Sequence, residues 1–372
     1  MKHIIVAMDS FKGSLTSQKA CEIVGKALEK VATKVTLIPI ADGGEGTAEA
    51  FLCAIGGERH YLWVTGPNGQ QVEAYFIVLA DGTAVIEMAQ ASGLSLAREK
   101  NPLITTTFGT GELIKAALAL KCPRIIVGIG GSATNDGGIG MAAALGASFL
   151  DKQGQEIKHT GGGLADLVAI DITGIDQRLA KTEIVVACDV NSPFYGPKGA
   201  SVVYGPQKGA DVTMVASLDA NLQNLARIIT QKLDINLQEL PGSGAAGGLG
   251  GGLVAFAGAK LSSGITILLD TVGFKQKLED CDLVITGEGS FDQQSLHGKV
   301  ISGIAKLTKA RHVPLIVLTG AVQLGRAEYE ELGVTAVFST NPRPCSIAQA
   351  KTEIVENLQQ LSENLAVTLQ IT

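Results

Sequence analysis

The stretch from Arg124 to Gly140, RIIVGIGGSATNDGGIG, constrains the fold more than any other part of the chain. It starts with an apolar run typical of a buried strand (Ile125–Val127), passes through a glycine-rich turn, and leads to a predicted helix at Met141–Leu145. Backbone N–H groups in such a turn, with a helix N-terminus behind them, form a site for anionic oxygens. The alternative is a tight strand-to-helix connection that binds nothing.

Polar side chains at the rim of this turn allow a more specific interpretation. Thr134, Asn135 and Asp136 supply a hydroxyl, an amide and a carboxylate, which suit a phosphate or carboxylate ligand together with a divalent cation. The turn also contains G-x-G-x-x-A (Gly128–Ala133), with Asp151 about 20 residues further on, as in dinucleotide-binding proteins. The glycines after Asp136 would weaken the helix that this second motif needs, and both interpretations stay open.

The composition is that of a globular protein with large cores. Hydrophobic residues make up 46% of the 372 residues and charged residues 18%, which argues against disorder and favours two domains. The net charge is -6 and no basic stripe is visible, so we expect neither nucleic acid nor a membrane as partner. The six cysteines are scattered, and neither a signal peptide nor a membrane span is recognisable. We expect a cytoplasmic protein.

Strands and helices alternate at both ends of the chain. Apolar runs at His3–Met8 and Val35–Ile40 each precede a predicted helix. The same alternation of apolar runs and helices occurs again from about Leu283. Three short strands joined by turn signals follow Gly57, so a different sheet begins there. The sequence predicts a two-domain α/β fold. We expect residues 1–60 and 265–372 to form a doubly wound parallel sheet, and residues 61–264 to form an inserted domain with a mixed sheet and glycine-rich loops.

Five acidic residues lie just after predicted strands. Ligands of open α/β sheets bind outside the carboxyl ends of the strands, so these side chains are expected to share one cleft. Carboxylates suit Mg²⁺, the usual companion of a transferred phosphate. Each one alone is more often a helix cap or turn residue than a ligand, but five in one chain favour a functional role. The five are Asp9, Asp42, Asp136, Asp189 and Glu288.

Lys12 is the cation most favourably placed beside such a cleft. It lies in DSFKGS, directly after the first predicted strand, and could hold a phosphate or a substrate carboxylate. A solvated loop lysine is the alternative. Other motifs fail: Gly298-Lys299 is followed by Val300 and is no Walker A loop, no G-x-S-x-G elbow occurs, and no histidines pair at metal-ligand spacing.

Nine blocks along the chain together resemble one known family. They are DSFKGSLTS (Asp9–Ser17), ADGGEGT (Ala41–Thr47), VIEMAQASGL (Val85–Leu94), TTTFGTGELI (Thr105–Ile114), GIGGSATNDGG (Gly128–Gly138), ACDV (Ala187–Val190), YGPQKGA (Tyr204–Ala210), PGSGAAGGLGGGL (Pro241–Leu253) and DLVITGEGSFDQQS (Asp282–Ser295). In this order they resemble the bacterial glycerate kinase family, of the ATP-dependent glycerate 2-kinase type.

The resemblance implies a function and an architecture. It implies ATP- and Mg²⁺-dependent transfer of the γ-phosphate to D-glycerate, catalysed by positioning and charge neutralisation. It further implies a flavodoxin- or Rossmann-like domain and an active site in a cleft between two domains. The product favoured for bacterial members is 2-phosphoglycerate, although the sequence does not show which hydroxyl is attacked. A homodimer is left open.

The resemblance also carries roles to particular residues. Asp189 and Asp136 become candidates for magnesium ligand or catalytic base, and Lys12 for the group that holds an anion. The candidate substrate contacts are Asp9, Ser10, Lys12, Asp42, Glu45 and Asn135. The candidate nucleotide contacts are Gly130, Gly131, Ser132, Thr134, Gly247, Gly248, Gly250 and Glu288.

The chain departs from the family pattern in two places. Ser290-Phe291 stand where the pattern has Arg-Ile, so no role can rest on an arginine at position 290. The loop after Asp189 reads NSPFYG in place of an Asn-Pro pairing.

Two other functions stay as alternatives. An NAD(P)-dependent dehydrogenase of a small hydroxy acid would use the turn at Gly128–Ala133. A non-catalytic sensor of hydroxy acids would use the same cleft, although strand-end carboxylates would repel an acid unless a metal were present.

Overall fold

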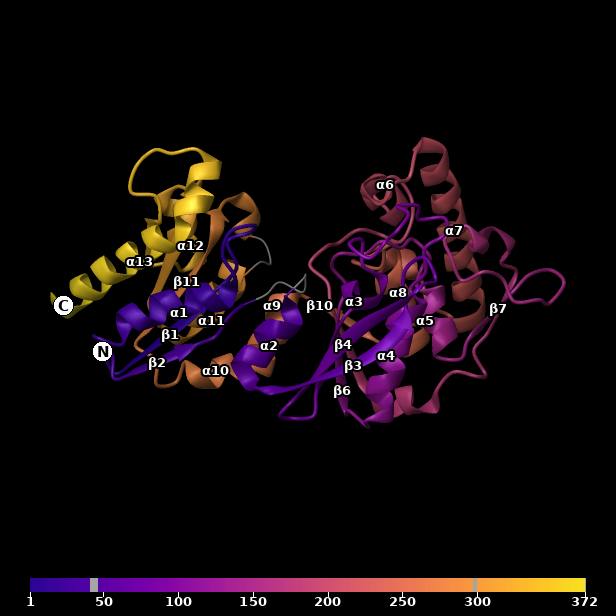
Figure 1. The fold of residues 1–372 in the computed structure, drawn as a ribbon, viewed down its shortest axis with the longest axis horizontal. Coiled ribbons are helices and arrows are strands. Elements are labelled where there is room, and N and C mark those ends of the chain that lie inside the picture. Colours follow the sequence, from indigo (N-terminus) through magenta and orange to yellow (C-terminus); the bar gives the residue numbers. More distant parts are fainter. Residues whose placement is uncertain (41–45, 297–299, 372) are drawn as a thin grey trace. The chain divides into compact units, whose positions relative to one another are not determined.

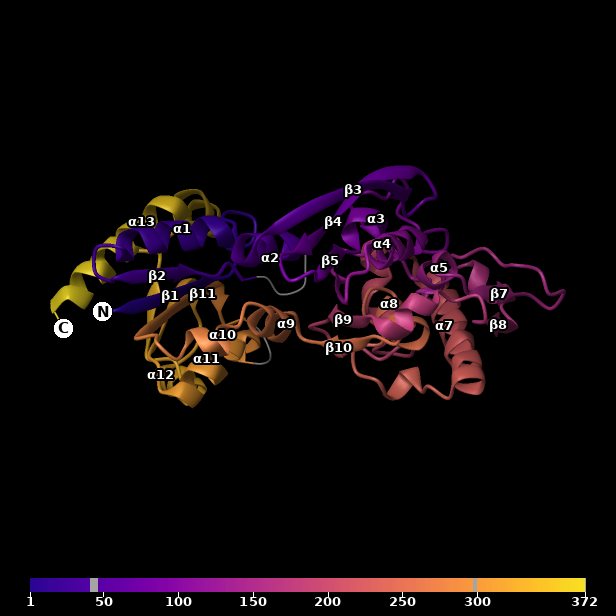
Figure 2. The same cartoon turned by 90° about the horizontal axis from the view of Figure 1, so that it is seen from below.

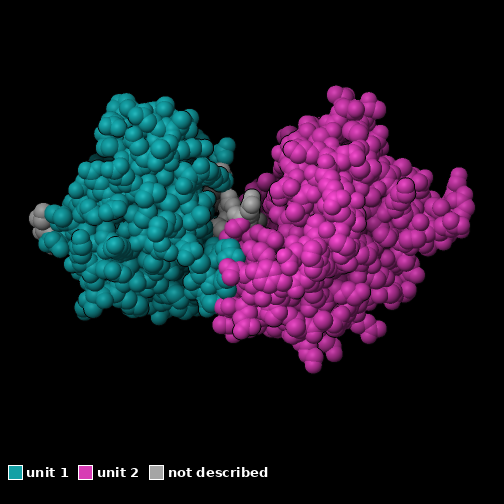
Figure 3. Space-filling model, in the orientation of Figure 1, with its two compact units in different colours: residues 1–42, 49–56, 265–372 teal, residues 43–48, 57–264 magenta. Residues whose placement is uncertain are grey.

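The computed structural model describes residues 1–40, 46–296 and 300–371 (Figure 1). The chain divides into two compact units, coloured separately in Figure 3. Unit 1 comprises residues 1–42, 49–56 and 265–372, and unit 2 comprises residues 43–48 and 57–264. The predicted substrate contacts Asp42 and Glu45 lie outside the described residues, as does Lys299. No described helix is both long enough and apolar enough to span a bilayer.

Unit 1 contains a five-stranded parallel sheet in the order β13-β12-β11-β1-β2. Its strands are β1 (His3–Met8), β2 (Lys34–Leu37), β11 (Leu283–Phe291), β12 (Leu315–Val322) and β13 (Ala336–Ser339). The helices that belong wholly or mainly to it are α1 (Ser17–Leu28), α2 (Thr47–Ile55), α9 (Gly264–Thr271), α10 (Phe274–Lys277), α11 (Val300–Arg311), α12 (Arg326–Leu332) and α13 (Ile347–Ile371). Helices α1 and α13 cover one face of the sheet, and α11 and α12 cover the other (Figures 1 and 2).

The strand order places a topological switch point between β1 and β11. From β1 the chain moves outward to β2 on one side, and from β11 it moves to β12 and β13 on the other. This is the flavodoxin-like order, so the prediction of a doubly wound parallel sheet is confirmed. Met8 pairs with Gly287, which brings Asp9 level with the outer part of β11. In this fold, ligands bind beyond the carboxyl ends of the strands at the switch point.

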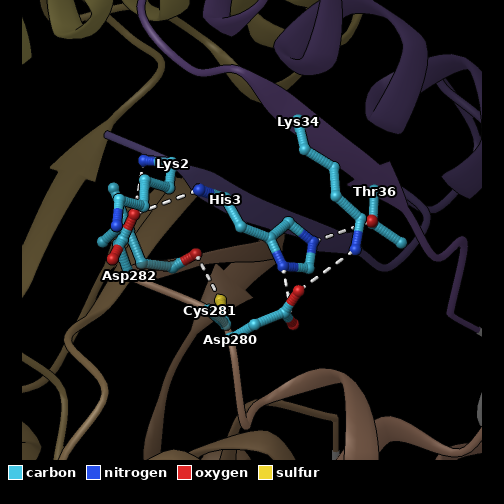
Figure 4. Close-up of polar contacts among 8 residues, drawn as sticks. Lys2, His3, Lys34, Thr36, Asp280, Cys281 and Asp282 are labelled. Atoms are coloured by element: carbon cyan, nitrogen blue, oxygen red, sulfur yellow. Dashed lines mark hydrogen bonds and ion pairs between the residues drawn. The ribbon is translucent and has the colours of Figure 1, made fainter.

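A polar cluster around His3 holds the strands of this sheet together at their amino ends, opposite the carboxyl ends where ligands bind (Figure 4). The buried ring has its Nδ1 atom 3.1 Å from Asp280 Oδ1 and its Nε2 atom 2.8 Å from Thr36 Oγ1. Asp282 Oδ2 accepts hydrogen bonds from the backbone N–H groups of Lys2 and His3. The hydrogen bond to His3 lowers the pKa of Asp280. Because the cluster joins β1, β2 and the start of β11 at their amino ends, we assign it a structural role.

Unit 2 is built on a six-stranded mixed sheet in the order β10-β9-β6-β5-β4-β3. The first four strands in this order are parallel, and β4 and β3 are antiparallel to their neighbours, as the predicted meander requires. These strands are β3 (Gly57–Thr65), β4 (Gln71–Leu79), β5 (Ala84–Glu87), β6 (Arg124–Gly128), β9 (Glu183–Ala187) and β10 (Lys260–Ser262), with β7 (Ser148–Leu150) and β8 (Ala169–Asp171) as a separate pair. The helices are α3 (Ala89–Ser92), α4 (Phe108–Ala119), α5 (Ile139–Ala144), α6 (Ala200–Tyr204), α7 (Val212–Leu233) and α8 (Leu249–Ala257).

The bounds of two elements, β11 and α8, affect the site. Strand β11 continues to Phe291 because its outer half pairs with β12, so Glu288 lies within a strand and not after one. Helix α8 begins only at Leu249, near the end of the glycine-rich stretch Gly242–Gly252. The residues before it form turns, with positive φ at Gly242, Gly247 and Gly248.

Candidate active site

A pocket of about 450 Å³ opens in unit 1 at the carboxyl ends of β1, β11, β12 and β13. It lies at the topological switch point, where ligands of this fold bind. Its lining includes four residues predicted for the site: Asp9, Ser10, Lys12 and Glu288. Ser290, which replaces the arginine of the family pattern, lines the same pocket.

The acidic side chains of this pocket are held by local hydrogen bonds. Asp9 Oδ1 accepts a 2.6 Å hydrogen bond from the N–H group of Ser10. Glu288 Oε1 accepts one of the same length from Ser295 Oγ, because the 3₁₀ turn after β11 places that hydroxyl beside the strand. The carboxylates are therefore held in place before any ligand binds.

The two glycine-rich stretches of unit 2 pack against each other. We call Gly128–Gly140 the first glycine segment and Gly242–Gly252 the second glycine segment. The N–H group of Gly137 donates to the Gly247 carbonyl (3.0 Å), and a Cβ on Gly247 would overlap the Thr134 carbonyl oxygen. Glycine is required here because two backbones meet without side chains between them.

This packing revises the predicted nucleotide contacts. Gly247, Gly248 and Gly250 are buried, and the N–H groups of the last two donate to the Gly244 and Ala245 carbonyls within the second glycine segment. A phosphate cradle at Gly248 and Gly250 is therefore not supported. Gly130 and Gly131 are accessible at the turn after β6.

Three predicted polar residues of the first glycine segment, Thr134, Asn135 and Asp136, are fully buried. Asp136 accepts hydrogen bonds from Thr107 N (2.7 Å), Thr107 Oγ1 (2.8 Å) and Gly138 N (3.0 Å). Burial raises its pKa, and these hydrogen bonds act in the opposite direction. Asn135 Nδ2 donates to Ser201 Oγ (2.9 Å). Such enclosed side chains shape the turn, so the geometry does not support Asp136 as metal ligand or base, or Asn135 as a substrate contact.

Asp189 differs from Asp136 because it is exposed. It follows β9, and its Oδ1 atom accepts a 3.1 Å hydrogen bond from the N–H group of Gly264 at the start of α9. Strands β6 and β9 are parallel neighbours with Gly128 opposite Ala187. Asp189 and the turn at Gly130 and Gly131 therefore lie at the same edge of the sheet.

Lys208 is a buried cation beneath the first glycine segment. Its side chain lies in a 3₁₀ turn (Pro206–Lys208) and is only 2% exposed. The Nζ atom donates to the Thr134 carbonyl (2.6 Å) and to Ser132 Oγ (3.1 Å). Ser132 Oγ also donates to the Ala246 carbonyl (3.3 Å) in the second glycine segment. Lys208 thus stabilises the first glycine segment directly and the second through Ser132. Burial lowers the pKa of Lys208 to about 7, and the negative charge of Asp136 acts in the opposite direction.

Comparison with known proteins identifies the family. The model of the glycerate kinase family matches residues 4–370. The chain belongs to the glycerate kinase family. A glycerate 2-kinase of Escherichia coli (strain K12) is 45% identical, with 99% of this chain and 98% of the relative covered. A glycerate kinase of Bacillus subtilis (strain 168) is 44% identical with the same coverage.

A solved structure supports the same fold. It carries the provisional name glycerate kinase 2, from Salmonella typhimurium LT2, and is 43% identical to this glycerate kinase family member. The TM-score is 0.89, and the match covers 100% of this chain and 98% of the other. The family inferred from the nine sequence blocks is confirmed.

Sequence reasoning assigned no role to Lys208, although the block YGPQKGA contains it. A lysine beside proline and glycine reads as a solvated turn residue, because lysine is almost never fully buried unless it is paired. The one sequence feature that could have indicated a role for Lys208 is its position inside a block that resembles the family.

The buried Lys208 predicts a pH-dependent stability. Its pKa is about 7 in the folded protein and about 10.5 in the unfolded chain, so the cost of burying the charge is full below pH 7 and falls as pH rises. Between pH 7 and pH 9, wild type should gain about 2 kcal/mol in free energy of unfolding relative to Lys208→Met. Urea unfolding at several pH values measures this difference. Lys152→Met, at an exposed lysine, should show no such trend, and a pH-independent Lys208→Met difference would contradict the prediction.

Proposed function

We propose that the protein transfers the γ-phosphate of ATP to D-glycerate and that the product is 2-phosphoglycerate. Membership in the glycerate kinase family across nearly the whole chain carries this proposal. The switch-point pocket with Lys12 and the exposed Asp189 support it, since phosphoryl transfer needs cations for the phosphates and a carboxylate for the base or the metal. The proposed substrates are small cytoplasmic molecules, in keeping with the expected location.

Asp189 is the carboxylate that we propose for the chemistry in unit 2. As a base it would accept the proton of the attacking glycerate hydroxyl, and as a metal ligand it would help hold Mg²⁺. Asp136 is reassigned to a structural role because its oxygens are enclosed by Thr107 and Gly138. The remaining catalytic effect would come from positioning and charge neutralisation.

Magnesium fits the donor set formed by Asp189 and by the acids that line the switch-point pocket. Among the described residues, no three acidic, histidine or cysteine side chains converge in a way that could hold a metal ion by themselves. Mg²⁺ commonly keeps several waters and uses one or two carboxylates together with substrate phosphates. Asp189, or Asp9 with Glu288, would suffice for such a site. When bound, the ion would neutralise charge on the phosphates.

The dehydrogenase alternative is not favoured by the geometry. A dinucleotide-binding turn leads directly into a helix whose N-terminus faces the pyrophosphate. In this chain, the turn that starts at Gly128 is followed by further loop residues, and the six-residue α5 begins only at Ile139 after the left-handed Gly138. The helix that the dinucleotide motif requires is thus absent from the turn.

A coupled ADP-release assay tests the proposed function. The assay should use D-glycerate and a panel of other hydroxy acids, with and without Mg²⁺, and ³¹P NMR should identify the phosphorylated hydroxyl. We expect Mg²⁺-dependent turnover with D-glycerate and a 2-phosphoglycerate product. Binding of hydroxy acids without turnover would instead favour the sensor, and NAD(H) binding seen by fluorescence would favour the dehydrogenase.

Replacement of Lys12 by alanine should raise the KM of one of the two substrates by at least about tenfold. Lys12 lines the switch-point pocket, where its ammonium group would hold an anionic oxygen. Steady-state kinetics with each substrate varied in turn measures the effect. Lys19→Ala is the control, because Lys19 is exposed on α1 and pairs with Glu22. Unchanged KM values for both substrates in Lys12→Ala would return Lys12 to the role of a solvated loop residue.

A further inference from the structure

The part of the switch-point pocket formed by β13 and the start of α13 has no assigned role. Thr340 and Asn341 follow β13, and Ile347, Ala350 and Lys351 lie in the first turns of α13. None of these residues belongs to the nine blocks that resemble the family. We propose that this region, which we call the β13–α13 subsite, binds the adenosine portion of ATP. The inference rests on the proposed function and specifies where its nucleotide binds.

The size of the pocket argues for a nucleotide. A volume of about 450 Å³ lies within the range of roughly 300–1,000 Å³ found for pockets that enclose drug-sized ligands. Glycerate, with three carbon atoms, would leave most of this space empty. ATP is the larger of the two substrates and matches the volume.

Two polar side chains of the subsite, Thr340 and Asn341, each have one buried atom without a hydrogen-bond partner among the described residues. Thr340 is 2% exposed, and its Oγ1 atom has no hydrogen-bond partner among the described residues. Asn341 Nδ2 donates to the Gly320 carbonyl (2.6 Å), which fixes the amide and leaves Oδ1 as a buried acceptor without a partner in the described part of the chain. Buried polar atoms without partners are costly, so a ligand donor is expected there. An adenine amino group or a ribose hydroxyl would supply it.

The other walls of the pocket suit a nucleoside with a phosphate chain. Phe11 and Ile354 are buried at the pocket wall, and Ile347 stands at its rim with 78% of its surface exposed. Apolar walls favour a flat base and contribute little to binding a small charged acid. Lys351 Nζ lies beside Gly13, 3.2 Å from where a Cβ on that residue would stand. Lys351 therefore neighbours the loop that carries Lys12, and both lysines line this pocket, where positive charge would favour phosphates.

Isothermal titration calorimetry with ADP and with D-glycerate tests the subsite in the full-length protein. Ala350→Trp should fill it and weaken ADP binding at least tenfold, with glycerate affinity unchanged. Ala348→Trp is the matched control, since Ala348 is exposed on the same helix and does not line the pocket, and it should bind ADP normally. Asn341→Leu, which removes the acceptor at similar size, should also weaken ADP binding. Thermal unfolding verifies that each variant is folded.

The outcomes separate this inference from the proposed function. Unchanged ADP affinity in folded Ala350→Trp and Asn341→Leu, with an active wild type, would overturn the subsite alone. Loss of glycerate binding with ADP binding retained would reassign the pocket to the acid and would also overturn the subsite. Failure of wild type to release ADP with glycerate would instead refute the proposed function, and absence of ADP binding in wild type would refute both.

Discussion

Replacement of Gly247 by alanine is expected to lower the free energy of unfolding by more than about 4 kcal/mol, or to prevent folding. Gly247 has φ +70, a conformation that costs an L-residue about 1–2 kcal/mol. The added Cβ would also overlap the carbonyl oxygen of Thr134 and lie 2.6 Å from the Asn135 Cα atom. Both atoms belong to the backbone of the first glycine segment. The steric overlap can therefore be removed only if the two glycine segments move apart.

Gly154 provides the matched control for this substitution. It has φ +75, but nothing lies within 4 Å of the position that a Cβ would take. Gly154→Ala should therefore lower the free energy of unfolding only by the cost of the left-handed backbone conformation, about 1–2 kcal/mol. Urea unfolding and thermal unfolding of both variants measure the difference. Similar losses in the two variants would show that backbone conformation alone, without the contact between the glycine segments, explains the effect.

Local periodicity was sufficient to predict much of the architecture. The continuous apolar run at His3–Met8 corresponds to β1, which is buried throughout. The turn signals after Gly57 identified the antiparallel strands β3 and β4, and the alternation after Leu283 identified the return to a parallel sheet. These patterns depend on neighbours close in sequence, which is why they could be recognised without a structure.

The segment that packs against the first glycine segment could not be predicted from local sequence patterns. Clustered glycines predict that the backbone approaches something closely, but they do not identify what it approaches. A phosphate was the local interpretation, whereas the structure places the second glycine segment there, far away in the sequence. Gly248 and Gly250 were assigned to the nucleotide for the same reason.

The burial of polar side chains also could not be predicted from neighbours close in sequence. Asp136 was predicted for the metal because it follows a strand, yet three contacts to Thr107 and Gly138 enclose it. Lys208 received no role because its burial depends on segments that are distant in sequence. By contrast, two of the five strand-end acids, Asp9 and Glu288, do line one pocket, together with Lys12. The rule on carboxyl ends of parallel strands needs only the strand positions, so it could be applied without a structure.

The substitution Asp189→Asn is expected to lower kcat by about 10²–10⁴-fold while leaving the fold intact. Asparagine keeps the size of the side chain and an oxygen that can accept the hydrogen bond from Gly264 N. It removes the negative charge that both proposed roles of Asp189 need. Asp171→Asn is the matched control, since Asp171 is also an exposed residue at the end of a strand whose oxygen accepts a backbone N–H, that of Thr173. Its kcat should equal that of wild type.

The same variant separates the two roles of Asp189. If Asp189 is the base, Asp189→Asn should lose the acid limb of the pH profile of kcat, with an unchanged Mg²⁺ requirement, because the group that must be deprotonated is gone. If Asp189 is a metal ligand, the Mg²⁺ concentration for half-maximal activity should rise, and excess Mg²⁺ should restore part of the activity. ADP release measured across pH and Mg²⁺ concentration distinguishes these cases. Turnover close to that of wild type would remove Asp189 from the mechanism and leave Asp9 and Glu288, the acids that line the switch-point pocket, to be replaced next.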